Sequence, residues 1–384
     1  MQIKIKINLG ICLVFFLLAL STAFAQEAEE HLKKGAQYYQ QRKFDLAIEE
    51  YKKAIEIKPS FAFAYTNLGV AYQAKGLFDL AIEQHKKAIE LNPRIPVTYT
   101  YLGSAYEAKG MLDEAIAEHK KAIELNPKLA LAYNSLGGCY FKKGMTEESI
   151  AQFQQAIELR PKYYKAIISL ALAYKAADKI DEAINQFKEA IKINPDNIVA
   201  YNYLAMAYGE KGMQKEAEEQ YKKAIEINPK APLPYTNLGT LYYHQGRYDE
   251  AIELHKKALS LRGSLAIAHS NLGKAYAKKN LHQEALEEFK IAISLNPNIS
   301  LLHYNLGLSY FESNQLDKAI EEFKKEIARQ PKNADANYSL AYALYLKEDY
   351  KEALKYAKIA QKEGHPKAEK LLQLLEEAGI ESEQ

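Results

Sequence analysis

A proline recurs every 34 residues along most of this chain, and no other feature constrains its fold as strongly. The series is Pro59, Pro93, Pro127, Pro161, Pro195, Pro229, Pro297 and Pro331, with Gly263 at the one internal exception. A fixed period of this length is typical of repeat architectures, in which each copy is one supersecondary unit. Such a unit cannot bury its apolar face alone. The period therefore predicts a stack of similar units, each resting on the next.

Residues 62–95 show what one unit contains: a helix, a turn, a second helix and a stop. Gly76 falls where a left-handed residue would end the first helix. Asn92-Pro93 ends the second helix, because proline lacks the N–H and disfavours helix at the residue before it. Four residues at i, i+3, i+4 and i+7 form one face of the first helix: Tyr65, Leu68, Gly69 and Tyr72.

A small residue follows the same period in the first helix of every unit. The series is Gly35, Gly69, Gly103, Gly137, Ala171, Ala205, Gly239, Gly273, Gly307 and Ala341. Only small side chains allow the two helices of a unit to approach closely, so we expect these residues to face the second helix. The turn glycine is less regular, with substitutes at Asp178, Asn280, Asn314 and Glu348.

The aromatic-x2-Leu-Gly-x2-Tyr run, the later Ala-x3-aromatic-x2-Ala run and the closing proline resemble the tetratricopeptide repeat family. The resemblance implies an all-α fold, a right-handed superhelical α-solenoid of antiparallel helix pairs. Ten repeats in phase would fill residues 28–367. Residues 368–384 then form a capping helix and tail, covering the face that the last repeat would expose.

The first 25 residues have the pattern of a secretory signal peptide. Lys4 and Lys6 precede an apolar run, and Ala23-Phe24-Ala25 matches a cleavage site. We expect cleavage after Ala25 and a periplasmic or secreted protein. The alternative is an uncleaved membrane anchor over residues 7–25.

Charge and cysteine content narrow the possible partners. Loss of residues 1–25 removes two of the 51 Lys and Arg and none of the 49 Asp and Glu, so the mature charges balance. A neutral chain has no bulk attraction to nucleic acid or anionic membranes. Cys139 is then the only cysteine, which excludes an intramolecular disulfide. We expect a buried, inert thiol.

No catalytic constellation is present, so no enzyme activity, cofactor or metal is predicted. The chain lacks a phosphate-binding glycine loop, an H-E-x-x-H motif and a Cys-x2-Cys pair. His85, His119 and His255 occupy a second-helix position that is aromatic in other repeats. A metal on His85 and His119 would have to span stacked helices about 8–10 Å apart. Core packing is therefore the expected role of these histidines, and also of His269 and His303.

Pairs of consecutive lysines recur in the second helices. A glutamate stands four residues before the second lysine of several pairs, which is the favourable orientation on a helix. We expect an outer face laced with salt bridges rather than a nucleic-acid site. The glutamates concerned are Glu49, Glu83, Glu219, Glu253 and Glu321.

The family resemblance implies that the first helix of each repeat lines a concave groove. Tyr243, Lys274 and Lys278 fall at groove positions. The predicted partner-binding residues are an aromatic cluster, Tyr304, Phe311, Tyr338, Tyr342 and Tyr345, and a basic patch, Lys142, Lys165 and Lys175. Packing of the aromatic cluster beneath the terminal helix is the alternative.

The function predicted from these features is a non-catalytic protein–protein interaction scaffold of the cell envelope. Its groove would bind an extended peptide or a partner's helix. The alternative is an accessory subunit of an envelope polysaccharide or outer-membrane assembly machine that binds glycan through the tyrosines. Some relatives grip a peptide's terminal carboxylate with lysines and asparagines from three repeats. The residues flanking Asn67 do not match that clamp, so this mode is not expected.

Overall fold

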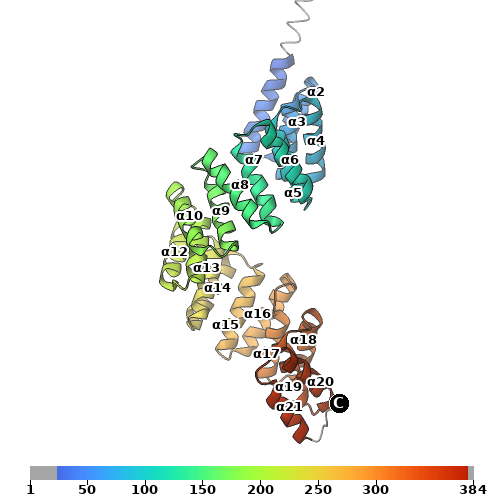
Figure 1. The fold of residues 1–384 in the computed structure, drawn as a ribbon, viewed down its shortest axis with the longest axis vertical. Coiled ribbons are helices and arrows are strands. Elements are labelled where there is room, and N and C mark those ends of the chain that lie inside the picture. The colour runs from blue at the N-terminus through green and yellow to red at the C-terminus, as the bar shows by residue number, and fades with distance from the viewer. Residues whose placement is uncertain (1–23, 379–384) are drawn as a thin grey trace, which may run out of the picture. The chain divides into compact units, whose positions relative to one another are not determined.

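The computed structural model describes residues 24–378, and every regular element in that range is a helix (Figure 1). The predicted signal peptide therefore lies outside the described residues, except for residues 24 and 25. None of the helices between residues 24 and 378 combines the length and the apolar character needed to cross a bilayer.

A helix over residues 24–40 comes first, and α2 to α21 follow it. Their bounds are α2 Phe44–Ile57, α3 Ala62–Ala74, α4 Phe78–Leu91, α5 Pro96–Ala108, α6 Leu112–Leu125, α7 Ala130–Lys142, α8 Thr146–Leu159, α9 Tyr164–Ala176, α10 Ile180–Ile193, α11 Ile198–Glu210, α12 Gln214–Ile227, α13 Pro232–His244, α14 Tyr248–Leu261, α15 Ala266–Lys278, α16 His282–Leu295, α17 Leu302–Glu312, α18 Leu316–Arg329, α19 Ala334–Leu346, α20 Tyr350–Lys362 and α21 Ala368–Glu377.

The helices pack as consecutive antiparallel pairs, such as α3 with α4 and α5 with α6, and the second helix of one pair packs on the first helix of the next, as α4 does on α5 and α14 on α15. First helices of successive pairs also touch, as α3 touches α5 and α15 touches α17. The chain forms two compact units, residues 1–195 and 196–384, and the same order of packing holds within each (Figure 1). The prediction of an all-α solenoid of helix pairs is confirmed. The division into repeats over 28–367 and a cap over 368–384 stays a prediction.

The turn inside each pair requires a left-handed residue whether or not it is glycine. Gly76 has φ +76° and Gly110 has φ +79°. The same conformation is kept by Arg42 and by the four predicted substitutes, Asp178, Asn280, Asn314 and Glu348, with φ between 57° and 62°. Side chains other than glycine are strained in this region. The close approach of the two helices therefore dictates the turn.

The small residue of the first helix lies directly against a ring of the second helix, sixteen residues later. A Cβ atom on Gly103 would stand 2.6 Å from Cε1 of His119, and one on Gly69 would stand 2.5 Å from Cε1 of His85. His85, His119 and His255 are 0% exposed. All three rings are buried in the core, as the packing interpretation predicts.

His269 and His303 are structural as well, because each bonds a glutamate of the second helix. Nδ1 of His269 lies 2.5 Å from Glu288, and its Nε2 lies 2.9 Å from the carbonyl oxygen of Gly263. Nδ1 of His303 lies 2.6 Å from Glu322.

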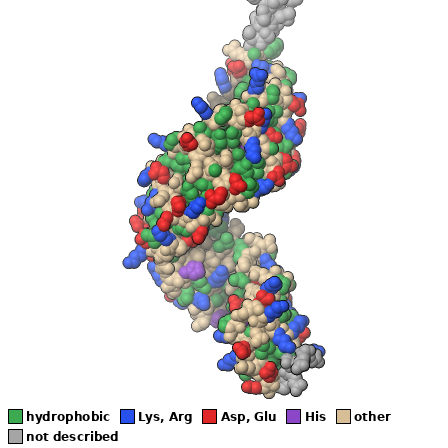
Figure 2. Space-filling model, viewed as in Figure 1, with side chains coloured by type: hydrophobic (Ala, Val, Ile, Leu, Met, Phe, Trp, Pro, Cys, Tyr) green, Lys and Arg blue, Asp and Glu red, His purple; other side chains and the backbone are tan. Residues whose placement is uncertain are grey.

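The two lysines of a pair have different contacts: in several pairs the first packs on an aromatic ring, and the second forms an ion pair. The first lysine covers the tyrosine of the next pair, as Lys86 does at 5.8 Å from the ring centre of Tyr106. Several second lysines pair with a glutamate, and among residues 24–378 the predicted spacing of four is used by Lys325, which bonds Glu321 at 2.7 Å. Lys87 instead bonds Glu90 at 2.9 Å, because a spacing of three also places side chains side by side. Basic and acidic side chains are interspersed on the face in view (Figure 2).

A second set of ion pairs joins consecutive helix pairs. An aspartate in the first turn of a second helix bonds the lysine that ends the first helix of the next pair. This places the anion at a positive helix terminus and the cation at a negative one. The bonds are Asp45–Lys75, Asp79–Lys109, Asp113–Lys143, Asp249–Lys279 and Asp317–Lys347.

Candidate functional site

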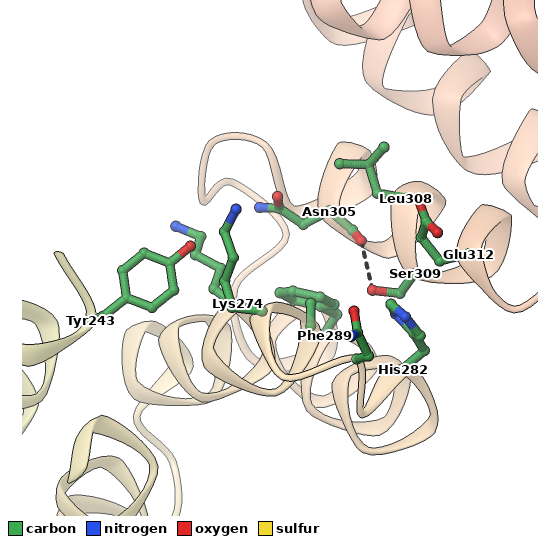
Figure 3. Close-up of a pocket in the computed structure, with 11 residues that line it drawn as sticks. Tyr243, Lys274, His282, Phe289, Asn305, Leu308, Ser309 and Glu312 are labelled. Atoms are coloured by element: carbon green, nitrogen blue, oxygen red, sulfur yellow. Dashed lines mark hydrogen bonds between the residues drawn. The ribbon is translucent and has the colours of Figure 1, made fainter. Parts of the chain in front are cut away.

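A pocket of about 450 Å³ lies among α13, α15, α16 and α17, inside the unit of residues 196–384 (Figure 3). The first helices contribute most of its walls, from the positions predicted to face the groove. Tyr243, Lys274 and Lys278 are among the residues that the family resemblance places at groove positions. The lining residues are Tyr243, Lys274, Ala277, Lys278, Asn280, His282, Phe289, Asn305, Leu308, Ser309 and Glu312.

Side chains from three successive pairs converge in this pocket. Tyr243 comes from α13, Lys274 from α15 and Asn305 from α17, and Figure 3 shows them pointing toward one another beside the ring of Phe289. Phe289 is 1% exposed and packs against Gly273, which holds the ring in place. The polar groups therefore stand on a fixed apolar wall.

Lys274 is a partly buried cation. Burial lowers the pKa of its ammonium group, because the charged form loses water. Among residues 24–378, no carboxylate forms an ion pair with Lys274. A cation in this state gains more from an incoming anion than a solvated surface lysine does.

Asn305 lacks the acceptor that its counterparts in earlier repeats have. Asn271 donates to the hydroxyl of Thr240 at 3.0 Å, one pair before it. The residue equivalent to Thr240 in the next step is Lys274, which can only donate. Nδ2 of Asn305 is consequently buried without a hydrogen-bond partner. Nδ2 of Asn305 and the ammonium group of Lys274 are both donors, so neither can accept a hydrogen bond from the other, and an acceptor is missing between them.

Tyr243 and Lys278 add two further donors, while the carboxylate of Glu312 lines the pocket from α17. Burial raises the pKa of Tyr243, which keeps its hydroxyl protonated and able to donate. Lys278 is exposed at the rim. An ammonium, an amide and a phenol around one space suit a carboxylate, whose two oxygens accept several hydrogen bonds. The arrangement can bind such a group.

The predicted aromatic cluster is assembled in the structure, next along α17 from this pocket. Tyr342 lies at its centre: its ring centre is 6.2 Å from Tyr338, 6.4 Å from Tyr345 and 5.8 Å from Phe311. Tyr304 stands apart from these contacts and packs on Phe323 at 6.1 Å. Four of the five predicted residues are thus joined by ring contacts, with Tyr338, Tyr342 and Tyr345 stacked and Phe311 tilted against Tyr342.

The aromatic cluster also has a structural side. All five rings are half-buried against a core that includes Leu371 and Leu375 of α21. Tyr338 stacks on His365, just before α21, with ring centres 4.0 Å apart. Tyr338 therefore packs on the segment that leads into α21, and the alternative, packing of the whole cluster beneath the terminal helix, stays open. Their role in partner binding stays a prediction.

The predicted basic patch lies in the other unit, residues 1–195. Lys142 bonds Glu107 at 2.9 Å, which offsets its charge. Lys165 is exposed in the first turn of α9, and Lys175 is partly buried near the end of that helix. The partner-binding role of these three lysines also stays a prediction.

Metal-ligating side chains gather at one place that the sequence analysis did not foresee. Glu107, His119 and Cys139 place their ligand atoms within 4.8 Å of one another, and no other such group occurs between residues 24 and 378. Cys139 is buried, as expected, and burial followed by the charge of Glu107 raises the pKa of its thiol to about 12. His85 does not take part.

These features define a helical-repeat fold with a polar pocket and an aromatic cluster on the first helices of its pairs. A family model described as the C-terminal domain of cilia and flagella-associated protein 70 matches residues 18–233, more than half of the chain. Four tetratricopeptide repeat models match residues 220–253, 239–280, 266–299 and 304–369. The chain belongs to the tetratricopeptide repeat family.

Solved structures with this fold span much of the chain. A tetratricopeptide repeat protein from Parabacteroides merdae is 21% identical, with a TM-score of 0.54, over 65% of this chain and 98% of that chain. The Cut9–Hcn1 hetero-tetramer of the APC/C gives 14% identity and a TM-score of 0.51, over 91% and 96%. MamA is 34% identical over 42% of this chain and 95% of that chain, with a TM-score of 0.39. No curated protein sequence matches the chain.

Proposed function

We propose that this protein is a non-catalytic scaffold that binds an extended peptide along its groove-facing helices. Membership of the tetratricopeptide repeat family supports a protein-interaction role. The proposal of peptide binding in this pocket rests on the unpaired donors of Lys274 and Asn305. A carboxylate of the peptide would enter this pocket, and its apolar or aromatic side chains would lie on the aromatic cluster.

The pocket and the aromatic cluster can serve one ligand because α17 contributes to both. Leu308 and Glu312 line the pocket, while Phe311, between them in sequence, contacts Tyr342 of α19. An extended peptide advances about 3.3 Å per residue. A few residues beyond the bound carboxylate would therefore reach the tyrosines.

Replacement of Lys274 by methionine is expected to weaken peptide binding at least about tenfold, because the carboxylate would lose its buried cation. The probe is a library of seven-residue peptides displayed with a free carboxyl end. Peptides selected on the wild type are remeasured by titration calorimetry, each beside its amidated form. Lys279→Met is the matched control, since Lys279 already pairs with Asp249 outside the pocket.

Equal binding by wild type and Lys274→Met, for free and amidated peptides alike, would exclude the pocket as the carboxylate site. Purified envelope polysaccharide fragments form the second arm of the same experiment. Binding of these fragments without any selected peptide would establish the glycan alternative in place of the peptide proposal.

The double variant Tyr338→Ala/Tyr345→Ala is expected to lower affinity for the same peptides at least about tenfold, with helix content unchanged. Aromatic side chains at a binding surface bury a large area with little loss of rotamer entropy, so they dominate binding energy. Tyr356→Ala is the control, because Tyr356 packs on the same core from α20. Loss of helix signal on the double variant would instead identify the aromatic cluster as core that holds α21 in place.

We also propose that the protein is exported and acts in the cell envelope or outside the cell. The charged start, the apolar run and Ala23-Phe24-Ala25 support this location. Amino-terminal sequencing of the protein from fractionated cells is expected to begin at Gln26. An intact residue 1 in the membrane fraction would favour the anchor over residues 7–25.

A further inference from the structure

Three side chains of different ligand types meet at the junction of two helix pairs. Glu107 is at the end of α5, His119 in the middle of α6 and Cys139 near the end of α7. Their ligand atoms lie within 4.8 Å of one another. All three belong to the unit of residues 1–195, so the junction is formed within one compact body.

Two of these residues differ from their counterparts in neighbouring repeats, while a histidine at the position of His119 recurs at His85 and His255. Cys139 stands where the other repeats mostly have alanine, as at Ala71 and Ala105. Glu107 stands where the preceding repeat has Gln73. Packing alone would accept alanine and glutamine at these places. The combination of thiol, carboxylate and imidazole therefore needs another explanation.

The hydrogen bonds of the neighbouring repeat show what the carboxylate has changed. Nε2 of His85 bonds Oε1 of Gln73 at 3.0 Å. In the next repeat neither ring nitrogen of His119 has a hydrogen-bond partner, although His119 is 0% exposed. A buried polar atom without a partner is costly, and its presence calls for an explanation. Here the two neighbouring groups are the other two ligand types of a metal site.

We propose that Glu107, His119 and Cys139 bind one zinc ion or a similar borderline-soft transition-metal ion. Thiolate, imidazole and carboxylate are the three side-chain ligands of zinc in proteins. The thiolate and the carboxylate together balance the charge of a divalent ion. Glu107 is at the edge of the site, with its side chain 21% exposed, which leaves an entry route and room for water as the fourth ligand.

The geometry requires only a small closure. Zinc bonds of about 2.0–2.3 Å in a tetrahedron hold ligand atoms roughly 3.5 Å apart, so the side chains must close by on the order of 1 Å. Oε1 of Glu107 bonds Lys142 at 2.9 Å, and the second oxygen of the carboxylate remains for the metal. On binding, the Cys139 thiol releases its proton to solvent, while His119 and Glu107 bind without a proton change.

The chain itself provides variants that should fold. Cys139→Ala restores the common residue, Glu107→Gln copies Gln73, and His119→Phe copies Phe153 and Phe187 at the same position. His255→Phe is the matched control, because both ring nitrogens of His255 are also unpartnered. Loss of this second buried histidine leaves the proposed ligands untouched.

The experiment uses the untagged, metal-stripped mature protein, titrated with Zn²⁺ alone by calorimetry and with Co²⁺ by absorption. We expect one zinc per chain and a thiolate-to-cobalt charge-transfer band in wild type and His255→Phe. Cys139→Ala and His119→Phe should lose the band. Their zinc affinity should fall by more than roughly 10–100-fold, which is the loss expected when a group that only hydrogen-bonds to a metal ligand is removed. Glu107→Gln should weaken zinc while keeping the band.

A melting curve provides a readout that is independent of the spectrum. Zinc should raise the melting temperature of wild type and of His255→Phe, because binding to the folded state stabilises it, but not that of Cys139→Ala. Absence of zinc binding in the wild type would overturn the proposal. So would equal binding in wild type and Cys139→Ala, which would identify an adventitious ion on the surface only.

Discussion

Replacement of Gly137 by leucine is expected to destabilise the protein by on the order of 3 kcal/mol, whereas the same change at Gly138 should have little effect. A Cβ atom on Gly137 would stand 2.7 Å from Cε1 of Phe153, and Phe153 is 2% exposed, so the ring cannot move aside. Beyond the backbone of its own helix and its chain neighbours, a Cβ atom on Gly138 would meet Oε1 of Glu107 at 3.9 Å.

The other repeats support this contrast between adjacent glycines. At the position of Gly137 no repeat has a residue larger than alanine, while at the position of Gly138 Leu172 and Leu308 are accommodated. Urea unfolding followed by circular dichroism measures both variants. Equal stability of the two variants would show that the contact of helix and ring does not limit packing within a pair.

Acidification from pH 7 to pH 4 is expected to destabilise the protein through its buried histidines, by roughly 3 kcal/mol for each site at pH 4. Burial lowers the pKa of His85 to about 3 and that of His255 to about 4, from 6.5. Between these values and 6.5 the unfolded chain binds the proton and the folded chain does not. The stability is complete above pH 6.5 and is lost as the pH falls toward the folded-state values.

The double variant His85→Phe/His255→Phe isolates this effect, because phenylalanine occupies the same position at Phe289 and Phe323. The free energy of unfolding, measured in urea at pH 7, 6, 5 and 4, should fall less steeply for the variant than for the wild type. Parallel slopes for the two proteins would mean that carboxylates, rather than these imidazoles, account for the acid sensitivity.

The local contacts within a helix pair could be predicted from the sequence because one period fixes them all. The positions of Gly69 and His85 recur sixteen residues apart in each copy, so a contact between them needs no long-range information. The partners of the second lysines were harder to predict, since spacings of three and four are both geometrically possible. The pattern also does not predict that α17 begins only at Leu302, after Leu301 in a left-handed conformation with φ +61°.

The pocket and the proposed metal site depend on differences between adjacent repeats. Asn305 is the same residue as its counterpart Asn271. It lacks an acceptor because Lys274 stands where the preceding repeat has Thr240, the residue that accepts from Asn271. Glu107, His119 and Cys139 are each unremarkable singly. Both sites become visible when each residue is compared with the residue at the equivalent position of the adjacent repeat, rather than with the consensus of all repeats.

The aspartate–lysine bonds between consecutive pairs give each compact unit an elastic property. Each bond is exposed and worth at most about 1 kcal/mol, so none of them determines the fold. They recur at the same place in successive steps, however, and every one resists the same opening of adjacent pairs. Salt screens such bonds. The resistance of a unit to bending should therefore decrease with rising ionic strength, while its helices stay intact.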